Sequence, residues 1–376
     1  MIYLDNAATT KPSKYALETA DKFNNECFYN PSALYQGGID NSKEIKLSKD
    51  KLLKHLGVDN KNFEVIYTSC GSESDNMAIF CCKKRGVFVT SKGEHSAVYK
   101  SFNELKQKGL TVEFIDLNVD GSINEEKLLE YVKNNKVDFV SIVHVNNETG
   151  AINDINKLAK LVKSIDKNIV FHSDGVQAFG KTPYNISNDV DLYSISAHKV
   201  NGLKGVGALI KKRSLNLSPL IFGGGQENGF RSGTENIFGI KVFEYASETH
   251  YNNLTKNYDL VGEYNKYLRQ NLDKEIFTII SSENASPYIL SVSAKGLRGE
   301  VLMHSLEEFG IVVGNGSACS SKNRYSRVLE ACGYKKEHLD GVLRISFSVE
   351  NSFDEIKFAT EKINLVAQKL KGIINK

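Results

Sequence analysis

Phe139-Val140-Ser141-Ile142-Val143 is an apolar run typical of a buried strand. A helical pattern over 151–165 and a second strand-like run, Ile169-Val170-Phe171, follow it. This order is typical of a parallel sheet covered by helices. The alternation continues on both sides, with further strands predicted at 64–68, 87–90, 112–115, 192–196 and 207–210. We therefore expect an α/β domain with a mostly parallel sheet, whose ligand binds at the carboxyl ends of the strands.

The chain changes character near residue 236. From Asn236 to Leu272 the pattern is long, polar-rich and helical, as expected of a helix that leaves one domain for another. Shorter strands are predicted at 289–292, 312–313 and 343–346, and a core-packing amphipathic helix at 352–375, with Ser352 and Glu355 as its capping box. We therefore expect a large domain at 13–255 and a smaller α+β domain made of 1–12 and 256–376.

Composition excludes several classes of protein. Lys and Arg number 48 and Asp and Glu 45 among 376 residues, and this net charge of +3 argues against a nucleic-acid partner. No apolar run reaches the roughly 18 residues of a membrane helix. The first residues do not resemble a signal peptide, so we expect a cytoplasmic protein with no membrane partner. The cysteines at 27, 70, 81, 82, 319 and 332 have spacings that fit neither a disulfide framework nor a structural zinc site.

A single lysine follows a predicted strand in a setting suited to covalent cofactor chemistry. Lys199 comes after Ser194-Ile195-Ser196-Ala197-His198 and before glycines at 202, 205 and 207. An amine beside hydroxyl and imidazole donors suits a Schiff-base lysine with an anion clamp. From these residues alone, a solvated surface lysine remains the alternative.

Two other strand ends carry candidate ligand groups. Asp174 directly follows the strand at 169–171 and is placed to hold the protonated nitrogen of a pyridine ring, with a helix N-cap as the alternative. The stretch 68–76 is a strand, a small-residue turn and a helix start, which suits phosphate binding or forms a plain turn. No Walker lysine or Gly-x-Gly-x-x-Gly fingerprint follows, so nucleotide binding is not indicated.

A loop of small residues surrounds one thiol, in Gly314-Asn315-Gly316-Ser317-Ala318-Cys319-Ser320-Ser321. An exposed, movable thiol is what a nucleophile requires, although a fortuitously exposed cysteine would have the same setting. The other cysteines are expected to be mostly small buried hydrophobic residues. Cys319 is therefore the candidate nucleophile of the chain.

Together these segments resemble the cysteine desulfurases of the NifS/IscS type, in the class V aminotransferase group of pyridoxal-phosphate (PLP) enzymes. The resemblance covers nearly the whole chain, from Tyr3-Leu4-Asp5-Asn6-Ala7-Ala8-Thr9-Thr10 to Leu343-Arg344-Ile345-Ser346. It includes 30–32, Glu94-His95, 144–150, 223–227 and 231–234. It implies PLP-dependent transferase fold type I and an enzyme that converts L-cysteine to L-alanine while Cys319 becomes a persulfide.

The same resemblance implies a role for each site residue. Lys199, His95 and Cys319 would be catalytic, and Asn147 and Arg344 would orient the substrate, with Arg344 forking onto its carboxylate. Asp174 would pair with the ring nitrogen of PLP, Gln177 would hydrogen-bond its ring hydroxyl and His95 would stack on the ring. The full set of implied cofactor-binding residues is Gly71, Ser72, His95, Asn147, Asp174, Gln177, Ser196, His198, Lys199 and Thr234.

The resemblance also implies partners. Thr234 would reach the phosphate of the partner subunit, which makes the enzyme a homodimer with shared active sites. The persulfide sulfur would pass to an acceptor protein for iron–sulfur cluster assembly, tRNA thiolation or thiocofactor synthesis such as that of thiamine. Cys319 would also serve as a transient iron–sulfur ligand, the one metal contact implied.

Four short segments of the sequence depart from the common pattern of this family. Gly175 replaces a usual alanine and is expected to loosen packing on the ring, and Gly314-Asn315 replaces a serine pair. Leu203 stands where proline is common, and Cys70-Gly71-Ser72 where Gly-Ala-Thr is frequent.

The alternatives to a cysteine desulfurase are a selenocysteine lyase, a class V aminotransferase, or a catalytically silent scaffold.

Overall fold

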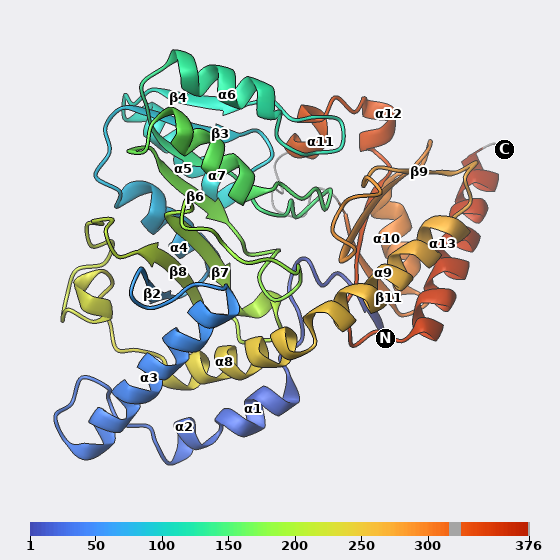
Figure 1. The fold of residues 1–376 in the computed structure, drawn as a ribbon. Coiled ribbons are helices and arrows are strands. Elements are labelled where there is room, and N and C mark those ends of the chain that lie inside the picture. Colours follow the sequence, from blue (N-terminus) through green and yellow to red (C-terminus); the bar gives the residue numbers. More distant parts are fainter. Residues whose placement is uncertain (316–324, 375–376) are drawn as a thin grey trace.

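The computed structural model describes residues 1–315 and 325–374, and these form two sheets, each with its own buried core (Figure 1). The larger sheet has the strand order β2-β8-β7-β6-β5-β3-β4 and the smaller one the order β1-β11-β12-β10-β9. Helix α8 (Ile237–Asn252) runs beside the larger sheet toward the smaller one, where α9 (Leu254–Asn271) continues (Figure 1).

The larger sheet confirms the predicted α/β class. Neighbouring strands from β4 through β7 pair in parallel, and only β8 lies antiparallel, between β7 and β2. The predicted strand positions are confirmed to within about two or three residues at each end. The strands are β2 (Phe63–Thr68), β3 (Val87–Ser91), β4 (Val112–Ile115), β5 (Val137–Ser141), β6 (Val170–Asp174), β7 (Leu192–Ser196) and β8 (Gly207–Lys212).

The helices that accompany this sheet precede or follow its strands in the chain. They are α1 (Lys14–Ala20), α2 (Lys22–Asn25), α3 (Gln36–His55), α4 (Gly71–Phe80), α5 (Ser96–Gln107), α6 (Glu125–Asn134) and α7 (Ile155–Ile165). The predicted start of the 151–165 helix is wrong. Asp154 accepts a hydrogen bond from the Lys157 amide at 3.0 Å and so caps α7, while Ile152 pairs with Val145 in a β-bridge.

The smaller sheet brings the N-terminus beside the last third of the chain, because β1 (Ile2–Leu4) pairs in parallel with β11 (Ile311–Asn315). The single helix predicted from 236 to 272 is two helices, α8 and α9, interrupted at Asn253. The remaining elements are β9 (Phe277–Ile279), β10 (Ile289–Ala294), α10 (Gly299–Glu307), α11 (Arg327–Ala331), α12 (Lys336–Leu339), β12 (Val342–Ser346) and α13 (Phe353–Ile374).

Helix α13 confirms the predicted core-packing helix and its cap. The Ser352 amide donates to Glu355 Oε2 at 3.0 Å, and the Glu355 amide donates to Ser352 Oγ at 3.2 Å. These reciprocal bonds form a capping box. Ile356, Ala359 and Ile363 are buried in the core of the smaller sheet.

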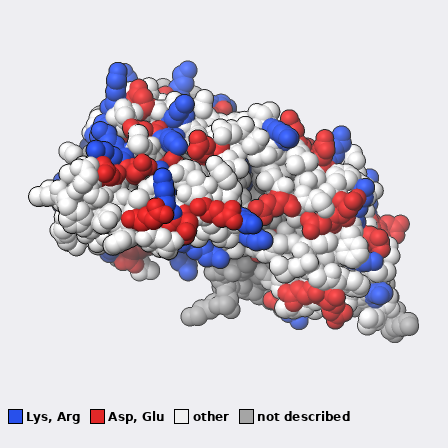
Figure 2. All heavy atoms as spheres, turned by 90° about the horizontal axis from the view of Figure 1, so that it is seen from below, with Lys and Arg blue, Asp and Glu red and all other residues white. Residues whose placement is uncertain are grey.

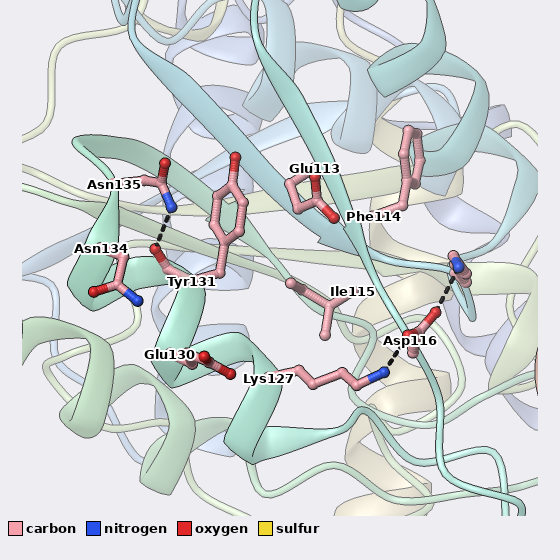
Figure 3. Close-up of a pocket in the computed structure, with 10 residues that line it drawn as sticks. Glu113, Phe114, Ile115, Asp116, Lys127, Glu130, Tyr131, Asn134 and Asn135 are labelled. Atoms are coloured by element: carbon pink, nitrogen blue, oxygen red, sulfur yellow. Dashed lines mark hydrogen bonds and ion pairs between the residues drawn. The ribbon is translucent and has the colours of Figure 1, made fainter.

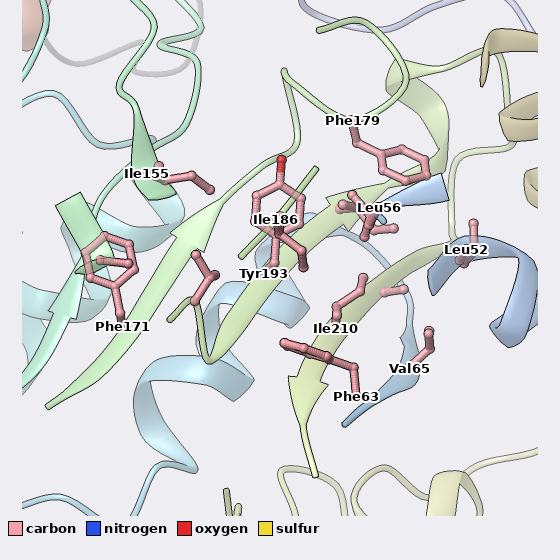
Figure 4. Close-up of a cluster of buried hydrophobic side chains, with 14 of the residues drawn as sticks. Leu52, Leu56, Phe63, Val65, Ile155, Phe171, Phe179, Ile186, Tyr193 and Ile210 are labelled. Atoms are coloured by element: carbon pink, nitrogen blue, oxygen red, sulfur yellow. The ribbon is translucent and has the colours of Figure 1, made fainter. Parts of the chain in front are cut away.

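The core of the larger sheet joins residues of α3, β2, β6, β7 and β8 (Figure 4). Tyr193 is buried at its centre, and its hydroxyl bonds to His144 Nδ1 at 2.8 Å. A Cβ on Gly175 would lie 1.9 Å from Tyr193 Cζ. Tyr193 therefore fills the side of Gly175 where a side chain would point.

The surface of the protein carries charged side chains of both signs. Figure 2 shows acidic and basic side chains interspersed over one face, as the small net charge suggests. No helix in the described part of the chain is long and apolar enough to cross a membrane.

Cys81, Cys82 and Cys332 are buried, and burial raises the pKa of the Cys332 thiol to about 12. Cys27 and Cys70 are partly exposed.

Candidate active site

A cavity of about 310 Å³ lies where the parallel strands β5, β6 and β7 end. Such strand ends are where open α/β sheets bind ligands, as the sequence predicted. The predicted site residues that line the cavity are Gly71, Ser72, His95, Asn147, Asp174, Gln177, Ser196, His198, Lys199 and Arg344. Ala7, Ala8, Cys70, Asp75, Val143, Val145 and Val176 complete its wall.

Lys199 faces this cavity from the short turn of 3-10 helix, Ala197–Lys199, that follows β7. Its Nζ donates to the carbonyl oxygens of Ala7 and Ala8, both at 2.6 Å. The solvated surface lysine allowed by the sequence is therefore not what forms. The N-terminal segment holds the amine inside the cavity, where a carbonyl-bearing ligand can reach it.

Two carboxyl groups and an imidazole meet at the next part of the wall. One oxygen of Asp174, one of Asp75 and one ring nitrogen of His95 all lie within 4.8 Å of one another. Burial raises the pKa of Asp75 well above its usual value, and the neighbouring Asp174 raises it further. Each of the two carboxyl groups therefore disfavours ionisation of the other. Sequence reasoning missed Asp75, which is the fifth residue of α4 and follows the predicted phosphate turn.

His95 is oriented by the helix that follows it. It is the N-cap of α5, and its Nδ1 accepts a hydrogen bond from the Ala97 amide at 3.2 Å. Because Nδ1 is the acceptor, the neutral ring carries its hydrogen on Nε2, which is then a hydrogen-bond donor. Burial lowers the pKa of His95, while Asp174 raises it and Lys199 lowers it again. The lowered pKa favours this neutral form.

The N-terminus of α4 forms an anion cradle. The side chain of its N-cap residue, Cys70, makes no capping hydrogen bond, so the first amides of the helix are not satisfied by it. Ser196 Oγ lies against the same cavity, is 2% exposed and has no partner among the described residues. His198 Nδ1 bonds to Thr9 Oγ1 at 3.1 Å. A phosphate group would supply hydrogen-bond acceptors to Ser196 Oγ and to the first amides of α4.

Gln177 is held by a residue that sequence reasoning did not single out. Gln177 Nε2 donates to the carbonyl of Ala7 at 2.8 Å, and Lys181 Nζ donates to Gln177 Oε1 at 2.9 Å. Lys181 therefore fixes which end of the amide carries N–H groups. Burial, then the charges of Lys199 and Arg344, lower the pKa of Lys181 to about 7. The sign of this contact in the sequence is that Lys181 lies four residues after Gln177.

Arg344 on β12 presents a guanidinium to the cavity. The residue is 4% exposed, Nη1 donates to the carbonyl of Asn147 at 3.0 Å, and Nη2 donates to Asp5 Oδ1 at 2.8 Å. Its buried Nε has no partner among the described residues. Gly314 lies opposite Arg344, and a Cβ there would come within 2.6 Å of Asp5 Oδ1. The glycine makes room for the Asp5–Arg344 ion pair.

Two predicted site residues are not part of this wall. Thr234 is exposed and lines a separate cavity of about 180 Å³ together with Thr68, Ser69 and Gly205. Cys319 lies outside the described residues.

A pocket of about 330 Å³ between β4 and α6 is separate from the site (Figure 3). Asp116 accepts hydrogen bonds there from Lys92 Nζ and Lys127 Nζ, each at 2.5 Å. These two lysines, which lower the pKa of Asp116 to about 2, are thus paired with a protein group. None of the predicted site residues lines this pocket.

Comparison with known proteins identifies the family of this chain. The profile of the aminotransferase class-V family matches residues 2–358. The chain belongs to the class-V aminotransferase family. Within this family, a cysteine desulfurase IscS of Dictyoglomus turgidum (strain DSM 6724 / Z-1310) is 34% identical over 382 residues, covering 99% of this chain and 96% of the relative.

Comparison with solved structures gives the same result. A NifS-like protein superposes with a TM-score of 0.91 at 31% identity, covering 98% of this chain and 99% of the other. A structure described as SspA in complex with cysteine has a TM-score of 0.81 at 28% identity, over 93% and 99% of the two chains. The resemblance to the NifS/IscS type and the expected transferase fold are thereby confirmed.

Proposed function

We propose that this class-V aminotransferase is an L-cysteine desulfurase that uses PLP and releases L-alanine. The observation that carries the proposal is a single cavity lined by both Lys199 and the guanidinium-bearing Arg344. The first group suits covalent attachment of a carbonyl cofactor, and the second suits the carboxylate of an amino acid. The relatives named as cysteine desulfurases, and the related structure described with cysteine, direct the choice among amino acids.

The residues present fit PLP. Ser196 Oγ and the α4 N-terminus offer donors to a phosphate, Asp174 offers a carboxylate to a pyridinium nitrogen, and Gln177 offers an amide to a ring hydroxyl. Lys199 provides the amine for the aldehyde. When bound, PLP supplies an electron-withdrawing ring that stabilises negative charge on the Cα of an attached amino acid.

The chain's own groups then divide the work. Arg344 and Asn147 orient L-cysteine, and the Lys199 amine moves the Cα proton. His95 lines the same cavity, and its Nε2–H is available as a hydrogen-bond donor. The Cys319 thiolate attacks the sulfur of L-cysteine, so an S–S bond forms and the Cβ–S bond breaks. Cβ takes up a proton, which leaves L-alanine and a Cys319 persulfide. L-Alanine formed from L-cysteine by the PLP-loaded protein tests this proposal.

The alternatives lead to different products. An aminotransferase would turn L-cysteine into a keto acid without releasing sulfur, and it has no use for the thiol of Cys319. A selenocysteine lyase would release alanine from L-selenocysteine in preference to L-cysteine, and its turnover would tolerate loss of the Cys319 thiol. A silent scaffold would bind no PLP and show no absorption band of the bound cofactor. The relatives named as desulfurases favour none of the three.

Exposed apolar side chains support the proposed homodimer. Phe222 is 82% exposed and Leu34 is 92% exposed, and Phe28 is also exposed. Large apolar side chains that are exposed on a single chain suit burial against a second one. A second copy of this chain would cover them and receive the exposed Thr234 into its own site.

Mixing two inactive variants tests the shared site. Homodimers of Thr234→Arg and of Lys199→Ala are each expected to be inactive. In a heterodimer, one site combines the native Lys199 of one subunit with the native Thr234 of the other. Alanine formation should then recover to about half of the wild-type rate per dimer, since one of two sites is intact. Purified heterodimers that stay as inactive as both parents would contradict shared sites.

A glycine next to the substrate arginine gives a second test. In Gly314→Ala, the new methyl group would displace Asp5 from Arg344, because it meets Asp5 Oδ1 at 2.6 Å. We expect the KM for L-cysteine to rise about tenfold, equivalent to about 1.4 kcal/mol, with a smaller change in kcat. Gly262→Ala is the matched control, since a Cβ there meets no atom within 4 Å. An unchanged KM in Gly314→Ala would show that the ion pair does not position Arg344.

The proposal extends to the organisation and setting of the chain. We place a large cofactor-binding domain at 13–255 and a small domain at 1–12 and 256–376, each built on one of the two sheets. The chain would act in the cytoplasm and pass sulfur from Cys319 to an acceptor protein. An iron–sulfur scaffold or a tRNA-thiolation enzyme would be such an acceptor, and Cys319 would hold a transient metal contact during delivery to the former.

A further inference from the structure

Arg327, the first residue of α11, reaches across from the smaller sheet's part of the chain to the loop that carries His95. Its Nη2 donates to the carbonyl of Glu94 at 2.5 Å, and its Nη1 donates to the carbonyl of Lys92. A guanidinium has two such donors in a rigid fork. The fork therefore fixes two peptide groups on the N-terminal side of His95.

The same guanidinium also contacts the element on the other side of His95. Its Cζ lies 3.7 Å from the ring centre of Tyr99, on the first turn of α5. A cation over an aromatic face is attracted to the ring, and the attraction grows when the pair is removed from water. Arg327 thus holds the backbone before His95 and the helix after it at once.

The residue before Arg327 docks on the substrate side of the cavity. Ser326 Oγ donates to Glu148 Oε2, and it also caps α11 by accepting a hydrogen bond from the Leu329 amide at 3.1 Å. Glu148 follows Asn147, whose carbonyl accepts from Arg344. The start of α11 is therefore fixed to both cavity loops, one with His95 and one with Asn147.

We propose that Arg327 is a positioning residue that sets the place of the His95 ring in the cavity. This inference rests on the proposed function, because it assigns Arg327 to the reaction of that site. Arg327 is not among the residues that line the cavity. It acts by holding the peptide groups of Lys92 and Glu94 and the ring of Tyr99. The short segment between them, which carries His95, is thereby held in one position.

A second arginine of the same kind provides a matched control. Arg269 of α9 donates from Nη1 to the carbonyl of Ser281 at 2.8 Å and from Nη2 to that of Ser282 at 2.9 Å. Like Arg327, it is half-buried and forks onto two backbone carbonyls, but none of these residues lines the cavity. Removing it takes away a similar contact without touching the His95 loop.

The test follows the ring of His95 directly as well as the reaction. The imidazole signals of PLP-loaded protein and of protein without PLP are recorded by NMR with labelled histidine, His95→Gln being used to assign His95. In Arg327→Gln and Arg327→Lys, the His95 signal should shift or broaden, while kcat for L-cysteine falls about tenfold or more and KM changes less than about twofold. Arg269→Gln should leave the His95 signal and kcat unchanged.

Each outcome decides the proposal. A shifted His95 signal and a lower kcat in both Arg327 variants, absent in Arg269→Gln, support it. An unmoved His95 signal with unchanged kcat overturns it, as does an equal response in Arg269→Gln. If Arg327→Gln does not fold, Arg327→Lys and Tyr99→Leu are read in the same way. A His95 shift in a protein that forms no alanine from L-cysteine would keep the positioning role and refute the proposed function.

Discussion

Cys319→Ser is expected to lower alanine formation from L-cysteine by roughly a thousandfold or more, because a hydroxyl is a far poorer nucleophile toward sulfur than a thiolate. PLP binding should be intact, since the groups that fit the cofactor lie on the wall of the cavity around Lys199 and Asp174. Addition of L-cysteine should still shift the absorption of the bound cofactor. Alanine and persulfide are measured together with the spectrum.

Two other cysteines make the controls for this variant. Cys332 is buried, with its thiol pKa raised to about 12, so Cys332→Ser should cost about 1–3 kcal/mol of stability and leave activity unchanged. Cys70 lines the cavity itself and is the thiol that would accept sulfur if Cys319 did not. Near wild-type turnover in Cys319→Ser, together with loss of turnover in Cys70→Ser, would move the nucleophile to Cys70. Near wild-type turnover in both would favour a selenocysteine lyase.

Lys199→Ala is expected to remove the absorption band of covalently bound PLP and to lower turnover by a factor of roughly a thousand. The amine is the group that the N-terminal carbonyls of Ala7 and Ala8 hold in the cavity, and no other lysine lines its wall in the described residues. Absorption spectra of purified protein, recorded without added amines, measure the first effect.

Lys204→Ala is the matched control for that variant, because Lys204 lies in the same turn and is exposed. It should keep both the band and the activity. A covalent band that persists in Lys199→Ala would show that another amine holds the cofactor, and Lys181 would be the next candidate, since its pKa is lowered to about 7.

Local patterns predicted most of the fold. The strands of the larger sheet are short apolar runs, and the Ser352–Glu355 capping box is set by residues three apart, so both can be recognised from neighbouring residues. The two helix errors also have local causes. Asp154 caps α7 later than the apolar pattern begins, and Asn253 interrupts a pattern that is polar on both sides.

The candidate site was predicted where one residue type has a strong chemical meaning. Lys199, Asp174 and Arg344 carry groups that few other residues can replace, and the structure places all three on one cavity. Asp75 and Lys181 were missed because an acid on a helix or a lysine in a turn is usually at the surface. Only the packing of β6, β7 and α4 buries the carboxyl of Asp75.

Contacts between distant parts of the chain could not be predicted from patterns. Arg327 bonds to a carbonyl 233 positions earlier in the sequence, and Asp5 pairs with an arginine 339 positions later. The smaller sheet creates both, because it pairs β1 with β11 and places β12 beside the cavity. The same geometry explains Gly314, whose missing side chain has no rationale until Asp5 and Arg344 are seen together.

A single turnover with L-cysteine tests the central claim most directly. PLP-loaded protein in excess is mixed with a smaller amount of L-cysteine, with no other thiol or reductant present, and alanine is quantified while the protein is analysed by peptide mass spectrometry. The account predicts one alanine per sulfur transferred, with the mass of one added sulfur atom on the peptide that contains Cys319. Alanine without added sulfur on that peptide, or a keto acid in place of alanine, would contradict it.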